Sequence, residues 1–162
     1  MKMEFSLSLT KLFFHAQGGG QPDDKGFIQL GERKINVIAL KESDQAIMHY
    51  IAPPDTDEVA GEQLISSLNG PIKMTIDLAL RTLFARLHSS GHLIGSLGEK
   101  IHPGLNGYKG NHFPGGKAFV VFQGKDLPNK EDFRSALEEE ITKSIKNALP
   151  VIADNKAETR TV

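Results

Sequence analysis

The sequence predicts an α+β fold in two parts, a small N-terminal β-barrel or sandwich over residues 1–76 and an α/β domain over residues 77–162. Two observations predict the first part: short stretches alternate apolar and polar residues, and glycine- and proline-rich turns separate them. A third observation predicts the second part: after Asp77 the apolar residues recur at the spacing of a helix. The boundary is a change of pattern and contains no low-complexity linker.

Four strands are expected in the first part. Met3, Phe5, Leu7 and Leu9 alternate with polar residues, and residues 35–39, 46–52 and 72–76 are further strand candidates. Turn signals lie between them at 18–26, 31–32, 53–55 and 69–71. Short strands joined by tight turns favour a small barrel or a sandwich.

Two helices and a strand are expected in the second part. Residues 78–97 carry a core-facing stripe at helical spacing, formed by Leu80, Leu83, Phe84, Leu87, Gly91 and Ile94. The glycine-rich stretch 98–117 predicts structure that is not regular throughout. Residues 118–122 predict a buried strand. Pro128 and Asn129 open a second helix that Pro150 ends, after which 151–153 starts a last strand. One face of that helix carries Phe133, Leu137, Ile141, Ile145 and Ala148.

Composition excludes several classes of function. The chain of 162 residues has no cysteine, which rules out disulfides, thiol catalysis and cysteine-ligated metals within it. No apolar run reaches the roughly 20 residues of a membrane span, and the alternating N-terminus is a poor secretory signal. We therefore expect a cytoplasmic protein without membrane contact.

Charge is unevenly distributed along the chain, although the net charge is −1. Between residues 78 and 125 the only acidic residue is Glu99, against the cations Arg81, Arg86, Lys100, Lys109, Lys117 and Lys125. Such a basic segment attracts an anionic partner, unless these cations simply form an ordinary solvated surface.

His88 and His92 are four residues apart on the first predicted helix, so their side chains point the same way and can hold one metal ion. The alternative is a pair of partly exposed helix histidines. A metalloprotease site is excluded because HSSGH lacks the glutamate that serves as general base there. Arg81 lies nearly in line with His88, and Asp77 is close enough to hold its guanidinium.

The segment GGGQPDD at 18–24 lacks the lysine of a phosphate-binding P-loop. Its glycines, Gly18, Gly19 and Gly20, permit positive φ and close approach of a ligand to the backbone. Gln21 could present its amide to a polar substrate. The alternative is a plain turn between strands.

Four segments occur in an order and at separations that resemble one family: GGGQPDDKG (18–26), MTIDLALR (74–81), RLHSSGHLIG (86–95) and KGNHFPGGKAFVVFQG (109–124). Together they resemble the alanyl-tRNA editing family. This comprises the editing domain of alanyl-tRNA synthetase and the free-standing AlaX proteins, and it is similar to the second additional domain of threonyl-tRNA synthetase.

The resemblance implies a β-barrel with the glycine motif, packed on an editing domain with the histidine helix. It implies hydrolysis of mischarged tRNA(Ala) carrying serine or glycine. His88 and His92 match half of a zinc site, and Gln21 matches the glutamine at the editing pocket. Gly18, Gly19, Gly20 and Gln21 would hold the aminoacyl end; Arg81, Arg86 and Lys109, with Lys100 and Lys117, would contact tRNA phosphates.

The sequence departs from that family at the other zinc half-site, a CxxxH motif. The chain has no cysteine and stops at Val162, about where the family leads into this motif. Either the chain is part of a longer protein or it lacks half of the metal site, in which case His102 or His112 could supply a substitute ligand. The function expected is aminoacyl-tRNA hydrolysis. The alternative is a non-catalytic relative that binds tRNA or a small polar ligand.

Overall fold

A computed structural model describes residues 5–9, 13–42, 47–51, 72–126 and 128–150. It divides into two compact units, one formed by Met1–His92 with Tyr108–Val121 and the other by Leu93–Gly107 with Phe122–Val162. No helix in the described part has the length and apolarity needed to cross a membrane.

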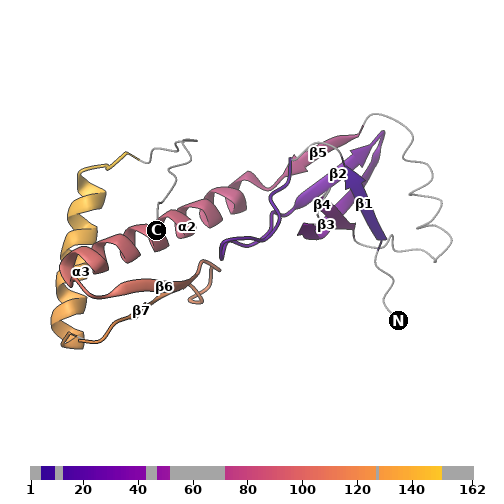
Figure 1. Cartoon of the computed structure of the whole chain (residues 1–162). Helices are drawn as coiled ribbons and strands as arrows, with labels where there is room; N and C mark the ends of the chain where they lie inside the picture. Colours follow the sequence, from indigo (N-terminus) through magenta and orange to yellow (C-terminus); the bar gives the residue numbers. More distant parts are fainter. Residues whose placement is uncertain (1–4, 10–12, 43–46, 52–71, 127, 151–162) are drawn as a thin grey trace, which may run out of the picture. The chain divides into compact units, whose positions relative to one another are not determined.

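Within the described residues, the elements follow each other as five strands, a helix, two strands and a helix (Figure 1). Their bounds are β1 Phe5–Leu9, β2 Gly26–Leu30, β3 Arg33–Glu42, β4 Ile47–Ile51, β5 Lys73–Ile76, α2 Leu78–Ile101, β6 Asn106–Asn111, β7 Phe119–Gln123 and α3 Lys130–Lys146. The predicted α+β class is confirmed.

The first five strands form one antiparallel sheet in the order β1-β4-β3-β2-β5. β2 and β3 are joined by a two-residue turn in which Gly31 has φ +56°. β1 and β5 lie at the two edges, so the described strands form an open sheet and the expected closed barrel is not confirmed.

One face of this sheet is the core of the first unit. Alternate residues of β4 are buried, as expected for a strand with one covered face. Phe14 and Ala16, which precede β2 in the chain, belong to the same buried cluster. The buried cluster consists of Phe14, Ala16, Ile28, Ile35, Val37, Leu40, Ile47 and Ile51.

The helix α2 extends four residues beyond the predicted 78–97, to Ile101. Asp77 caps its first turn, since its Oδ1 accepts a hydrogen bond from Leu80 N at 3.0 Å. Phe84 and Gly91 of the expected stripe are buried, whereas Leu83 is 41% exposed. The stripe is therefore narrower than the sequence pattern indicates.

The second helix, α3, begins where it was predicted, because Asn129 Oδ1 accepts hydrogen bonds from Glu131 N and Asp132 N. It ends at Lys146, before Pro150. Two predictions on burial are wrong: Ile145 is exposed whereas Ser144 is buried, and β7 exposes Phe119 and Val121. The strand expected at 151–153 lies outside the described residues.

Candidate functional site

The segment Gly18–Gln21, called here the glycine turn, closes on itself. Gln21 N donates to Gly18 O at 2.9 Å, and Gly18 N donates to Gln21 O at 3.2 Å. Gly19 and Gly20 between them have φ of +55° and +80°. Positive φ at both central residues is the pattern of a primed type I turn, which strongly favours glycine.

The glycine turn lies against His88 of α2. The Nδ1 of His88 is 3.1 Å from Gln21 Oε1. A Cβ on Gly19 would come within 3.2 Å of the Cε1 of His88, so this glycine is needed for space as well as for its φ. The turn therefore presents the Gln21 side chain to the histidine helix at short range.

His88 and His92 lie on one face of α2, as their spacing predicts. Their Nε2 atoms are 2.9 Å apart and their rings stack with centroids 4.8 Å apart. His92 is exposed and His88 half-buried. The two imidazole rings thus form a pair of possible metal ligands, of which that of His92 is exposed to solvent.

His112 is the third histidine of this cluster and is only 6% exposed. Its backbone N donates to Gly20 O at 3.1 Å, which ties the segment after β6 to the glycine turn. A Cβ on Gly91 would lie 2.1 Å from the His112 Cε1, and one on Gly110 3.0 Å from the same atom. The absence of side chains at Gly91 and Gly110 therefore leaves the space that the His112 ring fills.

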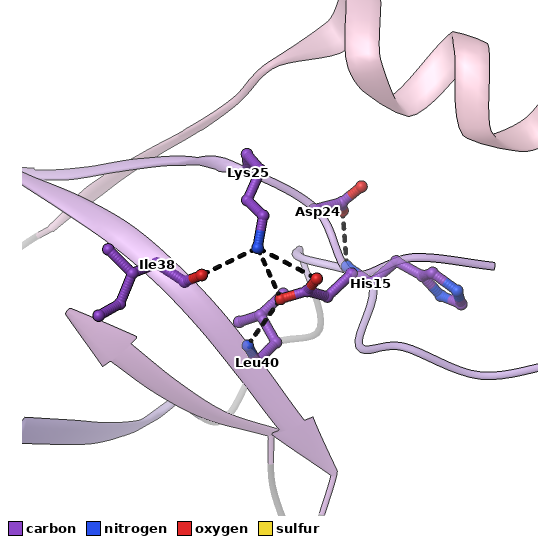
Figure 2. A network of polar contacts seen from close by, with 6 residues as sticks. His15, Asp24, Lys25, Ile38 and Leu40 are labelled. Carbon is purple, nitrogen blue, oxygen red and sulfur yellow. Dashed lines mark hydrogen bonds and ion pairs between the residues drawn. The ribbon is translucent and has the colours of Figure 1, made fainter. Parts of the chain in front are cut away.

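Two aspartates after the glycine turn fix it in the first unit (Figure 2). Asp23 accepts from Lys25 Nζ at 3.0 Å and from the backbone N of Leu40 in β3 at 3.0 Å, and Lys25 Nζ also donates to Ile38 O. Asp24 accepts from His15 N at 2.7 Å (Figure 2). The turn is thereby bound to the strand β3.

Asp24 also binds the histidine helix through Arg81. The Nε of Arg81 donates to Asp24 Oδ1 at 2.6 Å, the Nη2 donates to Oδ2, and Asp24 is 1% exposed. This pairing raises the pKa of Arg81 above its ordinary value, chiefly through the hydrogen bond. The prediction that Asp77 holds this guanidinium is wrong, because Asp77 caps the helix instead.

The environment of His88 and His112 favours the neutral form of each ring. Burial is the main cause that lowers the pKa of His88, followed by repulsion from His92 and His15. Burial also lowers the pKa of His112, followed by repulsion from His88 and His92. A neutral imidazole keeps one nitrogen lone pair, which a metal ion or a proton donor can use.

The chemistry of His88 and His92 fits two ligands of a zinc ion, because imidazole nitrogen is a common zinc donor. In the part of the chain that the structure describes, no group of three or more metal-ligating side chains is arranged to hold a metal. The ring of His112 stacks on that of His88 with centroids 4.8 Å apart and an angle of 14° between the ring planes. His102 belongs to the other unit, where its Nδ1 is buried without a hydrogen-bond partner among the described residues.

The structure brings six of the predicted site residues together in the first unit: Gly18, Gly19, Gly20, Gln21, His88 and His92. Arg81 is nearby in sequence but engaged by Asp24. Arg86 and Lys109 are exposed, and neither forms an ion pair within the described residues. Lys100 pairs with Glu140 at 3.0 Å in the second unit.

Sequence reasoning missed the supporting roles of Gly91, Asp24 and His112. A glycine inside a helix between two histidines signals a close neighbour, because glycine otherwise weakens a helix. Asp23 and Asp24 follow the glycine turn closely, which is typical of turn residues and does not indicate their contacts with β3 and α2. Nothing in the local sequence indicates that His112 is the ring that fills the space beside Gly91.

Comparison with known proteins finds similarity to one group of enzymes. The alanine–tRNA ligase of Cytophaga hutchinsonii is 28% identical over 111 residues, which is 68% of this chain and 11% of that protein. The enzyme of Methanosarcina acetivorans is 29% identical over 94 residues, or 57% of this chain and 9% of that protein.

A third example is the alanine–tRNA ligase of Methanocella arvoryzae, 31% identical over 98 residues, 59% of this chain and 9% of that protein. The chain is distantly related to alanine–tRNA ligases. It spans about a tenth of the length of these relatives. No protein-family model matches the sequence.

Proposed function

We propose that the chain is a hydrolase that removes serine or glycine from mischarged tRNA(Ala). The observation that carries the proposal is the contact between Gln21 of the glycine turn and His88 of the histidine pair. This contact joins two motifs that lie 67 residues apart in a chain related to alanine–tRNA ligases. Both motifs belong to the editing family that the sequence resembles.

The residues of the site would act mainly by position. Gly19 and Gly20 carry no side chains, so the 3′-terminal aminoacyl group can approach the backbone of the turn. The imidazole nitrogens of His88 and His92 can orient a water molecule toward the ester carbonyl. An aminoacyl ester is already activated, so orienting the water supplies a large part of the rate enhancement required.

Zinc is the cofactor that this proposal includes, held by His88 and His92 with further ligands from outside the described arrangement. A bound zinc ion would supply electrostatic polarisation of the ester carbonyl or of the attacking water. Serine can be preferred over alanine because a site that binds the hydroxyl disfavours an amino acid without one.

The partner in this proposal is tRNA, which the relationship to alanine–tRNA ligases supports. Arg86 and Lys109 are exposed cations of the same unit as the histidine pair and would contact its phosphates. Arg81 has a different role here: it holds Asp24 and hence the glycine turn.

The test is release of serine from seryl-tRNA(Ala) by this chain, with and without added zinc. Replacing His88 by alanine should reduce the rate by about 100-fold or more, the range for loss of a positioned catalytic group. Thr82→Ala is the control on the same helix, because that exposed hydroxyl donates to the Leu78 carbonyl, and its rate should match the unmodified chain. Equal release by the His88 variant would contradict the proposal.

A second candidate function is a tRNA-binding module without hydrolysis. It is favoured by one observation: among the described residues no group of three or more metal-ligating side chains is arranged to hold a metal, whereas catalytic zinc sites commonly use three protein ligands. Binding of tRNA(Ala) without release of serine at any zinc concentration would support this candidate and exclude the first.

A further inference from the structure

Gln21 contacts the histidine pair through an atom that can only accept a hydrogen bond. Its Oε1 is a carbonyl oxygen, so in the contact at 3.1 Å the Nδ1 of His88 must be the donor. A neutral imidazole has one N–H, and with this proton on Nδ1 the Nε2 carries a lone pair. The glutamine thus selects one of the two tautomers of His88.

The selected lone pair faces His92. The Nε2 atoms of the two rings are 2.9 Å apart, and one proton must lie between them for this to be a hydrogen bond. Since His88 Nε2 is the acceptor, His92 supplies that proton from its own Nε2. The three side chains therefore form a directed chain of donation, from His92 to His88 to Gln21.

The geometry of the turn makes this selection specific to Gln21. The paired hydrogen bonds between Gly18 and Gln21 fix the backbone from which the amide extends. The Gly19 position allows the turn to approach the His88 ring, where a Cβ would lie 3.2 Å from Cε1. The ring of His112 stacks on the His88 ring, with centroids 4.8 Å apart.

We propose that Gln21 is a positioning residue that holds His88 in the Nδ1–H tautomer and directs its Nε2 lone pair into the site. This assigns Gln21 a role other than the substrate contact expected from the sequence. The inference rests on the proposed function only for the use of the lone pair, which is to bind a zinc ion or a water molecule. The choice of tautomer is a property of the chain by itself.

The experiment is a long-range proton–nitrogen correlation spectrum of the uniformly ¹⁵N-labelled full chain without metal, which distinguishes the two tautomers of each neutral histidine. The His88 signals are assigned by their absence in His88→Ala. In the unmodified chain we expect His88 as the Nδ1–H form. An Nε2–H form of His88 would overturn the proposal at once, whatever the variants do.

Two variants of Gln21 separate hydrogen bonding from packing. Gln21→Leu removes the acceptor and should shift His88 toward the Nε2–H form, whereas Gln21→Glu retains an acceptor oxygen and should keep the proton on Nδ1. Gln123→Leu is the control, since Gln123 lies in the other unit and should leave His88 unchanged. An unchanged His88 tautomer in Gln21→Leu, with its backbone amide spectrum preserved, would also overturn the proposal.

Zinc affinity gives a second measurement. Measured by competition with a chromophoric chelator, it should fall about 10–100-fold in Gln21→Leu and be retained in Gln21→Glu, as for other residues that orient a ligating histidine. If no seryl-tRNA is hydrolysed but the tautomer changes as expected, the proposed function fails and this inference stands. If seryl-tRNA is hydrolysed but the His88 tautomer is unchanged in Gln21→Leu, the proposed function stands and this inference fails.

Discussion

At the scale of single residues, the site depends on the glycine at position 91. A Cβ there would lie 2.1 Å from the His112 Cε1, and the Gly20 and Gly110 positions are also in close contact with that ring. Alanine normally stabilises a helix by about 1 kcal/mol relative to glycine. Here the clash should outweigh that gain, because overpacking in a filled space costs about 1–3 kcal/mol.

We therefore expect Gly91→Ala to lower the free energy of unfolding by about 1 kcal/mol, measured by urea denaturation. Gly95→Ala is the matched control on the same helix, because a Cβ there meets nothing within 4 Å. That variant should gain up to about 1 kcal/mol. Equal stabilisation by both variants would show that the His112 ring is not confined as the structure has it.

The residues that could be predicted from the sequence are those whose role follows from local spacing. His88 and His92 share a face because four residues make about one helical turn. The glycine turn could be predicted because consecutive glycines permit positive φ. The contacts of Gln21 with His88 and of Asp24 with Arg81 join residues 67 and 57 positions apart, and no local pattern encodes such pairs.

At the scale of elements, the ion pair between Asp24 and Arg81 joins the glycine turn to α2. Asp24 is 1% exposed and Arg81 30%, so removing the carboxylate leaves a largely covered guanidinium without its partner. Breaking a buried pair by removing one member costs about 3–5 kcal/mol, and the partial exposure of Arg81 reduces this. Asp24→Ala should therefore lower the free energy of unfolding by about 2–3 kcal/mol.

The same variant should slow release of serine from seryl-tRNA, because the turn that carries Gln21 loses its anchor. Asp77→Asn is the control, since asparagine also caps a helix and should change stability by only a few tenths of a kcal/mol. Urea denaturation and the serine-release assay measure the two effects. A larger loss in Asp77→Asn than in Asp24→Ala would instead assign the guanidinium to Asp77.

Elements could be predicted where the apolar pattern is regular. The strand β4 lies within the candidate 46–52, and α3 starts directly after Asn129, as predicted. β2 was missed because Gly26–Leu30 adjoins turn residues, and β6 because NGYKGN is dominated by polar residues and glycine. β6 is paired with β7, so tertiary hydrogen bonding forms this strand despite its weak propensity.

At the scale of the whole molecule, the structure divides the cations of the basic segment into two groups. Arg81 is neutralised by Asp24, and Lys100 pairs with Glu140. The others in the first unit are Arg86, Lys109 and Lys117, which are exposed and form no ion pair within the described residues. Electrostatic attraction of tRNA should therefore depend on this second group.

Replacing Arg86 by glutamine tests this division. If Arg86 contacts a phosphate, the affinity for tRNA(Ala) should fall, and the slope of log affinity against log salt should become shallower by about one, because one fewer counterion is released. Fluorescence anisotropy titrations over a range of salt concentrations measure both quantities. Lys130→Gln changes the net charge equally but lies at the start of α3 in the other unit, so its slope should match that of the unmodified chain. Equal slopes for Arg86→Gln and the unmodified chain would remove Arg86 from the tRNA surface, while a shallower slope for Lys130→Gln would extend that surface to the second unit.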